Sequence, residues 1–303
     1  MALHIFRFQL AHNKVYQEYV ERIHSSVSQI HHYAQIPFLP ISFFKTHEVL
    51  CGSSAQTTFY SSGTTKTNLS RHLVADLELY NQSLLHGFEL FFGPVTDYSI
   101  FALLPSYHEN KNSSLLYMVE QLIQASGNQG GFFLDDLKEL LNQITKEKQK
   151  NKTMLIGVSY ALLDLAEQFQ PDLHDIMMIE TGGMKGRRQE LIKADLHQVL
   201  KEKFQSQSIG SEYGMTELLS QAWSKGDGIF TCPPWMKILT REYNDPFELI
   251  QGKTGGINVI DLANIWSCSF IATQDLGIVK GNQFEIAGRF DDADLRGCNL
   301  LVG

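Results

Sequence analysis

The sequence predicts an α/β fold, with mainly parallel sheet layers flanked by helices and a smaller β-rich section. Between Asp97 and Phe204, short apolar runs alternate with segments of helical periodicity, which is typical of strands joined by helices. After Ser208 the helical periodicity disappears, and prolines and glycines separate short apolar runs. A length of 303 residues allows a large core, in one domain or in one domain with a small appendage.

Helical spacing of apolar residues first occurs near the N-terminus. It predicts a helix from about Asn13 to Ala34 that ends before Pro37. The apolar segment 36–45 contains two prolines, so we expect an extended crossing there. A further set of apolar residues shares one helical face and predicts a helix after a hydroxyl-rich loop: Val74, Leu77, Leu84, Phe88 and Phe91.

The central region predicts alternating strands and helices. Strands are expected at 100–104, 154–158 and 176–179, and helices at 113–124, 135–148, 161–169 and 189–204. Beyond residue 208, the runs 257–262 and 270–273 predict short, partly antiparallel strands. We therefore expect an α/β part over 1–207, a β-rich part over 208–287 and a short hinge-like tail over 288–303.

Composition excludes several classes of function. The net charge is −8 and no extended basic run occurs, so the sequence lacks the electrostatic pattern of a nucleic-acid-binding protein. Four widely spaced cysteines without a CxxC pair argue against a zinc cluster and against a disulfide-rich secreted fold. The N-terminal residues do not form a signal peptide, and no apolar window approaches the length of a bilayer span. By elimination, we expect a cytoplasmic protein.

The hydroxyl loop, residues 57–67, concentrates Ser and Thr around Gly63 and Lys66. Its hydroxyls, its backbone N–H groups and the lysine charge can all bind phosphoryl oxygens. It is not a Walker A loop, because no second glycine lies five residues before Gly63. By itself, the pattern fits a phosphate-binding loop and a Ser/Thr-rich surface turn equally well.

Four more stretches follow apolar runs, at positions where a parallel sheet places its ligand sites: 180–188, 211–217, 272–277 and 288–292. Together with residues 61–66 they resemble, in sequence and in order, the motif series of the adenylate-forming superfamily. That superfamily includes acyl- and aryl-CoA ligases, luciferases and nonribosomal adenylation domains. The resemblance implies an ATP-dependent ligase.

Longer phrases at 36–40, 104–107, 180–188 and 295–300 narrow the resemblance to the acyl-protein synthetase family. This family is the fatty-acid-activating component of the reductase complex in luminous bacteria, and the match runs from about Ile36 to Gly303. The resemblance implies formation of an acyl-AMP from ATP and a fatty acid, followed by transfer of the acyl group to a cysteine near the C-terminus. It also implies a partner, an acyl reductase.

The resemblance assigns roles to individual residues. Tyr213 would stack on adenine, Gly182 and Gly183 would let the backbone approach the adenine face, and Asp275 would accept hydrogen bonds from the ribose. Glu217 would hold magnesium, and Thr216 completes the same motif. The residues expected to bind the β- and γ-phosphates are Ser61, Ser62, Gly63, Thr64, Thr65 and Lys66.

Structural alternatives stay open for several of these residues. Tyr213 could simply be buried and Glu217 could lie on the surface. Arg289 could bind the ribose or the α-phosphate, or pair with Asp291 or Asp292. Arg187 and Arg188 could reach phosphate or face solvent, and Gln274 stands where the family pattern commonly has glycine.

Two candidate catalytic residues lie outside the nucleotide motifs. Cys298 stands in an Arg-Gly-Cys phrase with Arg296 two positions before it, and a nearby positive charge would favour the nucleophilic thiolate. The alternative is a small buried core residue, which is the expected role of the other three cysteines. His108 follows 104–107, close to where many adenylating enzymes have a histidine beside the acyl carboxylate, and it could equally be solvated.

Adenylating enzymes typically continue beyond the hinge with a small domain that carries a catalytic lysine, and no such domain follows Gly288-Arg289 within these 303 residues. This favours self-acylation over a domain-alternating CoA ligase. Two alternatives are an acid:CoA ligase of the phenylacetate type and a catalytically silent nucleotide-binding module. The acyl chain and the oligomeric state are not predicted by the sequence.

Overall fold

The computed structural model of this chain describes residues 1–24, 26–62, 69–106, 108, 110–182 and 191–290. The predicted α/β class is confirmed, and the chain forms two compact units. Unit 1 comprises Met1–Ser83, Thr216–Ser220 and the chain from Thr231, and unit 2 comprises Leu84–Met215 and Gln221–Phe230. The functional division of the sequence at residues 207 and 287 stays a prediction.

Unit 2 contains a mixed sheet in the order β10-β9-β8-β7-β6-β4-β5. The five strands from β8 to β5 run parallel, and β9 is antiparallel to β8. All six residues of β4 are buried, as expected of a parallel strand covered on both faces. The bounds are β4 Tyr98–Leu103, β5 Gly130–Phe132, β6 Lys152–Val158, β7 Met177–Thr181, β8 Gly210–Tyr213, β9 Ala222–Ser224 and β10 Ile229–Thr231.

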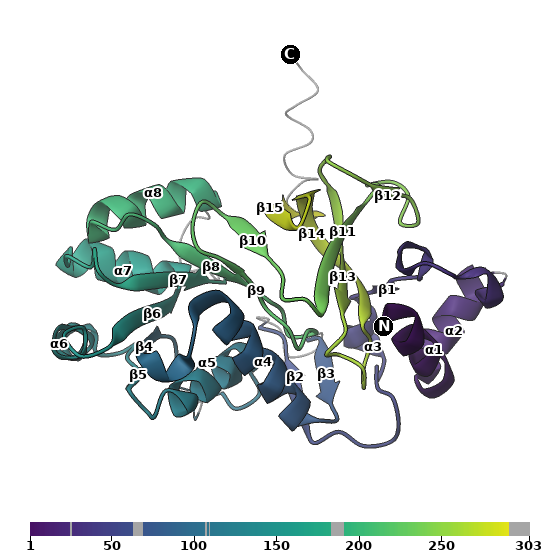
Figure 1. Cartoon of the computed structure of the whole chain (residues 1–303), viewed down its shortest axis with the longest axis horizontal. Coiled ribbons are helices and arrows are strands. Elements are labelled where there is room, and N and C mark those ends of the chain that lie inside the picture. The colour runs from purple at the N-terminus through teal and green to yellow at the C-terminus, as the bar shows by residue number, and fades with distance from the viewer. Residues whose placement is uncertain (25, 63–68, 107, 109, 183–190, 291–303) are drawn as a thin grey trace, which may run out of the picture. The chain divides into compact units, whose positions relative to one another are not determined.

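Helices cover both faces of this sheet, with α7 and α8 over one face and α5 over the other (Figure 1). Side-chain caps define two of the starts, since Ser113 accepts a hydrogen bond from the Leu116 N–H and Asp136 accepts one from Glu139. The predicted central helices are confirmed, with ends displaced by a few residues. Their bounds are α4 Leu77–Phe92, which begins in unit 1, then α5 Ser114–Ala125, α6 Leu137–Glu147, α7 Ser159–Phe169 and α8 Lys193–Phe204, with a 3-10 turn, η3, at Val95–Asp97.

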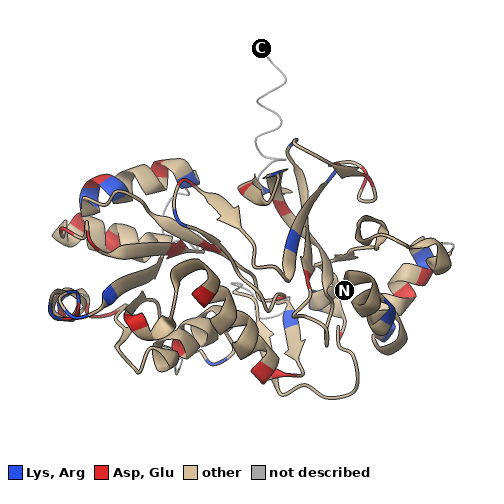
Figure 2. Cartoon of the chain, viewed as in Figure 1, with Lys and Arg blue, Asp and Glu red and all other residues tan. Residues whose placement is uncertain are grey.

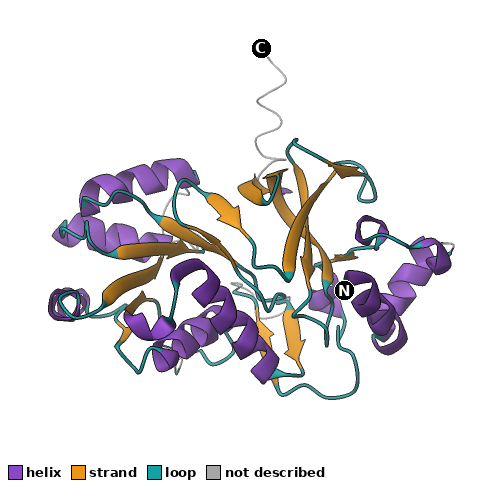
Figure 3. Ribbon diagram, viewed as in Figure 1, coloured by secondary structure: helices purple, strands orange, loops and turns teal. Residues whose placement is uncertain are grey.

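Unit 1 is built mainly from antiparallel strands, which confirms the predicted β-rich section (Figure 3). Its larger sheet has the order β12-β11-β13-β14-β15, and β1 pairs in parallel with β14. Every residue of β13 is buried, so this strand forms the centre of the unit 1 core. The bounds are β1 Leu39–Pro40, β11 Met236–Arg241, β12 Leu249–Ile250, β13 Gly255–Asp261, β14 Phe270–Lys280 and β15 Gln283–Arg289.

The N-terminal helix prediction was wrong in both extent and number. Two helices form, α1 (Ala2–His12) and α2 (Lys14–Ile23), and the chain then makes short 3-10 turns at Val27–Gln29 and Tyr33–Gln35. Asn13 separates the helices by capping α2. Beyond α2, the Ser26 N–H donates to His24 and the Ser26 and Ser28 hydroxyls bond to each other, and such local bonds compete with the helix. The segment 36–45 contains β1 and one short helix, α3 (Phe43–Thr46), rather than a wholly extended crossing.

The sequence predicts that the hydroxyl loop opens directly onto a helix, and this prediction is wrong. Its first residues form β2 (Thr57–Tyr60), which pairs antiparallel with β3 (Arg71–Val74). Val74 therefore ends a strand, and α4 begins three residues later. Residues 61–70 connect the two strands of this hairpin.

Basic and acidic positions are interspersed along α2 and α8 rather than separated onto different helices (Figure 2). This distribution agrees with the absence of an extended basic run in the sequence. Within the described ranges, no helix is both long enough and apolar enough to cross a bilayer.

Candidate functional site

In unit 1, Ser61 of the hydroxyl loop, the phosphate-loop candidate, is joined to Ser70 just beyond that loop. The Ser61 N–H donates to the Ser70 carbonyl at 3.1 Å, and the Ser70 N–H donates to the Ser61 hydroxyl at 2.9 Å. Ser62 is exposed beside this closure. The remaining predicted phosphate-binding residues, Gly63, Thr64, Thr65 and Lys66, lie outside the described residues.

Glu217 lies next to the base of this loop. Its side chain is buried, with 4% exposure, and it accepts a hydrogen bond from the Ser70 hydroxyl. Burial raises the pKa of Glu217, and the nearby Asp275 adds to the rise, whereas the Ser70 hydrogen bond and the Arg289 charge oppose it. Glu217 is therefore not the surface glutamate of the alternative interpretation.

Asp275 and Arg289 face each other across β14 and β15. Arg289 Nε lies 3.7 Å from Asp275 Oδ1, with the two side chains 60% and 18% exposed. The register shifts by one residue between this pair and the Gly277–Ile286 pair, so a β-bulge in β15 places Ala287 opposite no partner. Gly288 has a φ of 146°, a value that L side chains rarely adopt. Asp291 and Asp292, the alternative partners of Arg289, lie outside the described residues.

A buried hydrogen-bond network holds the backbone of the Glu217 segment. His72 Nδ1 donates to the Thr216 carbonyl at 2.7 Å, and His72 Nε2 lies 3.0 Å from Asn264 Oδ1. Asn264 Nδ2 donates to the Glu217 carbonyl at 2.8 Å and to the Cys268 carbonyl at 3.0 Å. Burial lowers the pKa of His72 to about 4, against the effect of both hydrogen bonds.

Asp261 fixes the residues that follow Glu217. Its carboxylate accepts hydrogen bonds from the Leu219 N–H at 2.8 Å, the Ser220 N–H at 3.0 Å and the Ser220 hydroxyl at 2.6 Å. Burial raises the pKa of Asp261, and these hydrogen bonds counteract the rise. Residues 216–220 are thus attached at both ends to the β-rich core of unit 1.

The predicted adenine-binding residues belong to unit 2. Gly182 directly follows β7 with a left-handed φ of 73°, and its carbonyl accepts a hydrogen bond from the Ser159 hydroxyl at 2.9 Å. Tyr213 ends β8 with 8% exposure, and its ring packs edge-on against Phe230 at 5.9 Å. Gly183 lies outside the described residues. Both described residues lie at the carboxyl edge of the parallel strands, as predicted for a ligand site.

Two glutamates beside these residues have opposite pKa shifts. Burial acts to raise the pKa of Glu180, but the nearby His197 ring, the Lys193 charge and hydrogen bonds from Ser159 and Lys193 outweigh it and lower the pKa to about 2. Burial raises the pKa of Glu212 to about 7, although Thr181 donates a hydrogen bond to its carboxylate at 2.7 Å. The surroundings thus favour the ionised form of Glu180 and the protonated form of Glu212.

The catalytic candidates are located only in part. His108 is exposed on a turn, where its N–H donates to the Ser106 hydroxyl at 3.2 Å. Cys298 lies outside the described residues. Burial raises the pKa of both Cys51 and Cys232 to about 12 and that of Cys268 still further, so these three thiols are poor nucleophiles at neutral pH.

The side chains of Glu217 and Asp275 in unit 1 suit a divalent cation that is also bound by the oxygens of a polyphosphate. Glu217 and Asp275 offer the hard oxygen ligands that magnesium prefers, and magnesium commonly uses one or two carboxylates together with substrate phosphates. No group of three or more His, Cys, Asp or Glu residues in the described part of the chain could hold a metal. The residues present therefore fit a magnesium ion whose remaining ligands are phosphate oxygens and water.

Sequence reasoning missed His72, Asn264 and Ser70, and it gave no role to Glu180. Ser70 could have been found as the hydroxyl residue just beyond the phosphate-loop candidate, and Glu180 as the last charged residue of a buried strand. His72 and Asn264 belong to no motif. Their roles depend on contacts between residues 192 positions apart.

No family model matches the chain. Its sequence is similar to two proteins named long-chain-fatty-acid–luciferin-component ligase. The one from Aliivibrio fischeri is 23% identical and the one from Vibrio harveyi 24% identical, and each alignment covers 98% of this chain and 85% of the relative.

The fold is that of adenylate-forming enzymes. ATP-bound MatB from Rhodopseudomonas palustris aligns with a TM-score of 0.59 and 17% identity over 77% of this chain and 47% of that one. AMP-bound O-succinylbenzoate Coenzyme A synthetase (MenE) from Bacillus subtilis aligns with a TM-score of 0.57 and 17% identity over 80% and 51%. The chain spans about half the length of these solved structures. The predicted resemblance to adenylate-forming ligases of the fatty-acid-activating type is confirmed.

Proposed function

We propose that this chain is an ATP- and magnesium-dependent ligase that converts a fatty acid to its acyl adenylate and transfers the acyl group to Cys298. The observation that supports the first step most directly is the clustering of Glu217, Asp275 and Arg289 beside the closed base of the phosphate-loop candidate. The similarity to two fatty-acid ligases along nearly the whole chain supports the choice of acid.

In the first step, a carboxylate oxygen of the acid attacks the α-phosphorus of ATP and the bond to pyrophosphate breaks. The products are acyl-AMP and pyrophosphate. Catalysis of this displacement requires alignment of the reactants and neutralisation of phosphate charge. Magnesium, when bound, supplies positive charge to the phosphate oxygens, and Glu217 is the carboxylate proposed to hold it.

Asp275 and Arg289 are proposed to bind the adenylate portion. Asp275 accepts hydrogen bonds, which suits the ribose hydroxyls. Arg289 has five N–H groups, and its side chain is 60% exposed beside Asp275, which suits donation to a phosphate as well as to the carboxylate. Gly182 and Tyr213 would contact adenine, with Ser61, Ser62, Gly63, Thr64, Thr65 and Lys66 around the leaving pyrophosphate.

In the second step, the Cys298 thiolate attacks the acyl carbonyl carbon and AMP leaves, which forms a thioester. The thiol proton passes to solvent. An acyl reductase is the proposed acceptor of the acyl group, and His108 is the proposed neighbour of the substrate carboxylate.

The first step is tested by acid-dependent exchange of labelled pyrophosphate into ATP. We expect exchange with long-chain fatty acids that is lost on omission of magnesium. Nucleotide binding without exchange for any acid in a broad panel would contradict the ligase proposal and favour a silent nucleotide-binding module.

The second step is tested separately, with labelled fatty acid and ATP. We expect the protein to acquire label that hydroxylamine removes, and Cys298→Ala to abolish this label while pyrophosphate exchange persists. Equal labelling of Cys298→Ala would contradict the transfer step. Release of an acyl-CoA in the presence of CoA, with no labelled protein, would identify the acid:CoA ligase alternative instead.

A further inference from the structure

A separate pocket lies at the opposite edge of the unit 2 sheet. It has a volume of about 450 Å³, within the range of small-molecule sites. Its walls include the first residues of four strands: Tyr98 of β4, Lys152 of β6, Met177 of β7 and Gly210 of β8. Gly182 lies five residues after Met177, so the length of β7, about 16 Å at 3.3 Å per residue, separates this pocket from the predicted adenine-binding edge.

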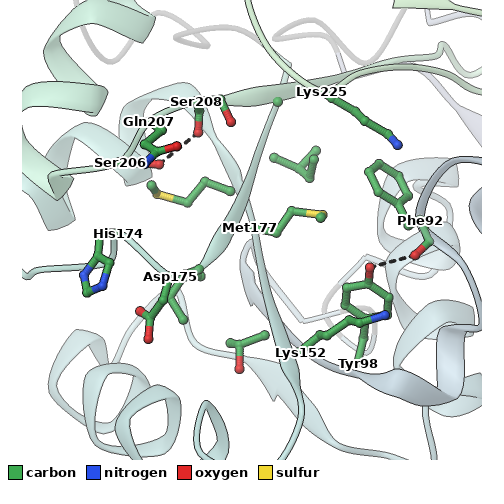
Figure 4. Close-up of a pocket in the computed structure, with 15 residues that line it drawn as sticks. Phe92, Tyr98, Lys152, His174, Asp175, Met177, Ser206, Gln207, Ser208 and Lys225 are labelled. Atoms are coloured by element: carbon green, nitrogen blue, oxygen red, sulfur yellow. Dashed lines mark hydrogen bonds between the residues drawn. The ribbon is translucent and has the colours of Figure 1, made fainter.

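One half of the pocket combines an apolar surface with two lysines, and we call it the lysine half: Phe92, Tyr98, Lys152, Met177 and Lys225. Figure 4 shows Met177 pointing toward Phe92, with Lys225 near the Phe92 ring and Lys152 beside Tyr98. Lys225 Nζ lies 5.9 Å from the centre of the Phe92 ring, and Lys152 Nζ lies 5.5 Å from that of Tyr98.

The aromatic residues of the lysine half offer a ligand no free polar atom. The Tyr98 hydroxyl donates to the Phe92 carbonyl at 2.8 Å, so its hydrogen bond is already made inside the protein. Phe92 and Tyr98 are only 8% and 2% exposed, whereas Met177, the first residue of β7, is half-buried. An apolar chain placed here would bury its own surface mainly against Met177.

Three of the charged or titratable lining residues have partners outside the pocket wall. Asp175 pairs with Lys148 at 3.3 Å, His174 bonds to Asp172 at 2.7 Å, and Lys152 pairs with Asp97 at 3.2 Å. Among the described residues, no carboxylate lies within ion-pair distance of Lys225. The exposed Lys152–Asp97 pair is of a kind that contributes little free energy, so Lys152 can exchange its partner.

We infer that this pocket is a binding site for an amphiphilic carboxylate. The carboxylate would pair with both Lys225 and Lys152. The apolar chain would lie over Met177 and Phe92. The site is distinct from the proposed adenylation site and requires neither ATP nor magnesium.

The test is a titration of the full chain, labelled at its methionine methyl groups, with octanoate in the absence of nucleotide and magnesium. The sequence has eight methionines, so the spectrum is small, and Met177→Leu identifies the reporting signal. We expect a saturable shift of the Met177 signal, with little change at Met236 of β11 in unit 1. The uncharged 1-octanol tests whether the carboxylate is needed.

Lys225→Gln keeps much of the side-chain length and removes the charge, and we expect it to weaken octanoate binding about tenfold, as the loss of a charge-assisted contact does. Lys237→Gln is the matched control, because Lys237 is also exposed and lies 5.6 Å from the centre of an aromatic ring, that of Tyr33 in unit 1. We expect it to bind as wild type does.

Three results would overturn the inference: no saturable shift of Met177, an equal response to 1-octanol, or equal octanoate affinity in Lys225→Gln and wild type. Equal affinity in Lys225→Gln and wild type is also the result expected if octanoate binds only at the proposed adenylation site. Because pyrophosphate exchange is not the readout, failure here leaves the proposed ligase activity standing, and failure of exchange leaves this site standing.

Discussion

At the residue scale, Glu217 is subject to two opposing requirements. Burial favours its neutral, protonated form, whereas binding of a cation requires the carboxylate. Binding of magnesium to this carboxylate should therefore strengthen as the pH rises through the raised pKa of Glu217. Asp275 and Arg289 adjust this balance in opposite directions.

Replacement of Glu217 by glutamine separates these effects. Glu217→Gln retains the shape but cannot neutralise a cation, so we expect pyrophosphate exchange to fall on the order of 100-fold. The melting temperature should stay equal or rise, because the variant removes a buried ionisable group. Glu89→Gln, at an exposed position of α4, is the control for loss of a carboxylate. Wild-type exchange in Glu217→Gln would remove this residue from the site.

His72 gives a second prediction, on pH dependence. Its pKa is lowered from 6.5 to about 4, so the unfolded chain binds a proton that the folded chain does not between these values. Stability from this residue is therefore complete above pH 6.5 and is lost as the pH falls, by about 3 kcal/mol in total.

His72→Gln should reduce the slope of melting temperature against pH between 4 and 6.5. If Glu217 holds magnesium as proposed, activity of this variant should require about tenfold more magnesium, because His72 supports the backbone of the Glu217 segment. His86→Gln, at an exposed position of α4, is the matched histidine control. An unchanged slope in His72→Gln would show that protonation of His72 does not govern the pH dependence of stability in this range.

Contiguous motifs in the sequence were enough to predict a role for Glu217, Asp275 and Arg289, and these roles stay predictions. Glu217, Asp275 and Arg289 were found because each motif also contains recognisable neighbours, and the structure gathers all three in unit 1. The supporting residues could not be found in this way. A histidine on a short strand gives no signal that its ring contacts an asparagine 192 residues later.

At the element scale, Asn13 links the start of α2 to the core of unit 1. Its Oδ1 accepts from the Tyr16 N–H at 3.0 Å, and its Nδ2 donates to the Ser267 carbonyl at 2.9 Å. The residue is 1% exposed, so neither bond is readily replaced by water. The same side chain thus caps a helix and joins it to a segment 254 residues away.

A series of substitutions measures the two contributions. Asn13→Ser keeps a capping oxygen and loses the Ser267 bond, whereas Asn13→Ala loses both. We expect Asn13→Ala to cost about 2–3 kcal/mol of unfolding free energy, and Asn13→Ser about 1 kcal/mol less than that. Denaturant unfolding gives both values. Equal stability of the two variants would show that the cap contributes nothing.

The sequence predicted well those elements whose formation depends mainly on one pattern of apolar residues. The parallel strands are continuous apolar runs bounded by helices, and β6 and β7 lie where those runs occur. The error between Asn13 and Ala34 arose because apolar spacing continued past Ile23, while the local bonds of Ser26 and Ser28 stopped the helix. Helical period alone does not reveal such competition.

At the scale of the whole molecule, neither compact unit is a continuous piece of chain. The chain passes between them after Ser83, Met215, Ser220 and Phe230. Because each unit is completed only by chain that has already passed through the other, we expect the two to unfold together. This is the two-state behaviour that smaller single domains show.

Tryptophan fluorescence tests this expectation, since Trp223 belongs to unit 2 and Trp235 and Trp266 to unit 1. A Trp235→Phe, Trp266→Phe double variant reports on unit 2, and Trp223→Phe reports on unit 1. We expect fluorescence and circular dichroism to give the same urea midpoint within each variant. Different midpoints within one variant would mean that the units unfold independently.

The overall class was predictable because it depends on summed patterns rather than on single contacts. Alternation of period before Ser208 and its loss afterwards predicted both kinds of sheet. The composition of the units was not predictable in the same way. Residues 216–220 belong to unit 1 because Asp261 and Asn264 bind them, and no periodicity announces those bonds.

The β-bulge at Ala287 has a consequence for changes in chain length. Side chains alternate along a strand, so a regular ladder continued from Ile286 would place Gly288, not Arg289, opposite Asp275. Deletion of Ala287 would leave Arg289 paired with Asp275 and merely straighten the strand, whereas insertion of a residue beside it would turn the guanidinium to the other face. Homologous chains should therefore tolerate a missing residue at this position and not an additional one, an asymmetry that paired deletion and insertion variants would reveal as retained and lost pyrophosphate exchange.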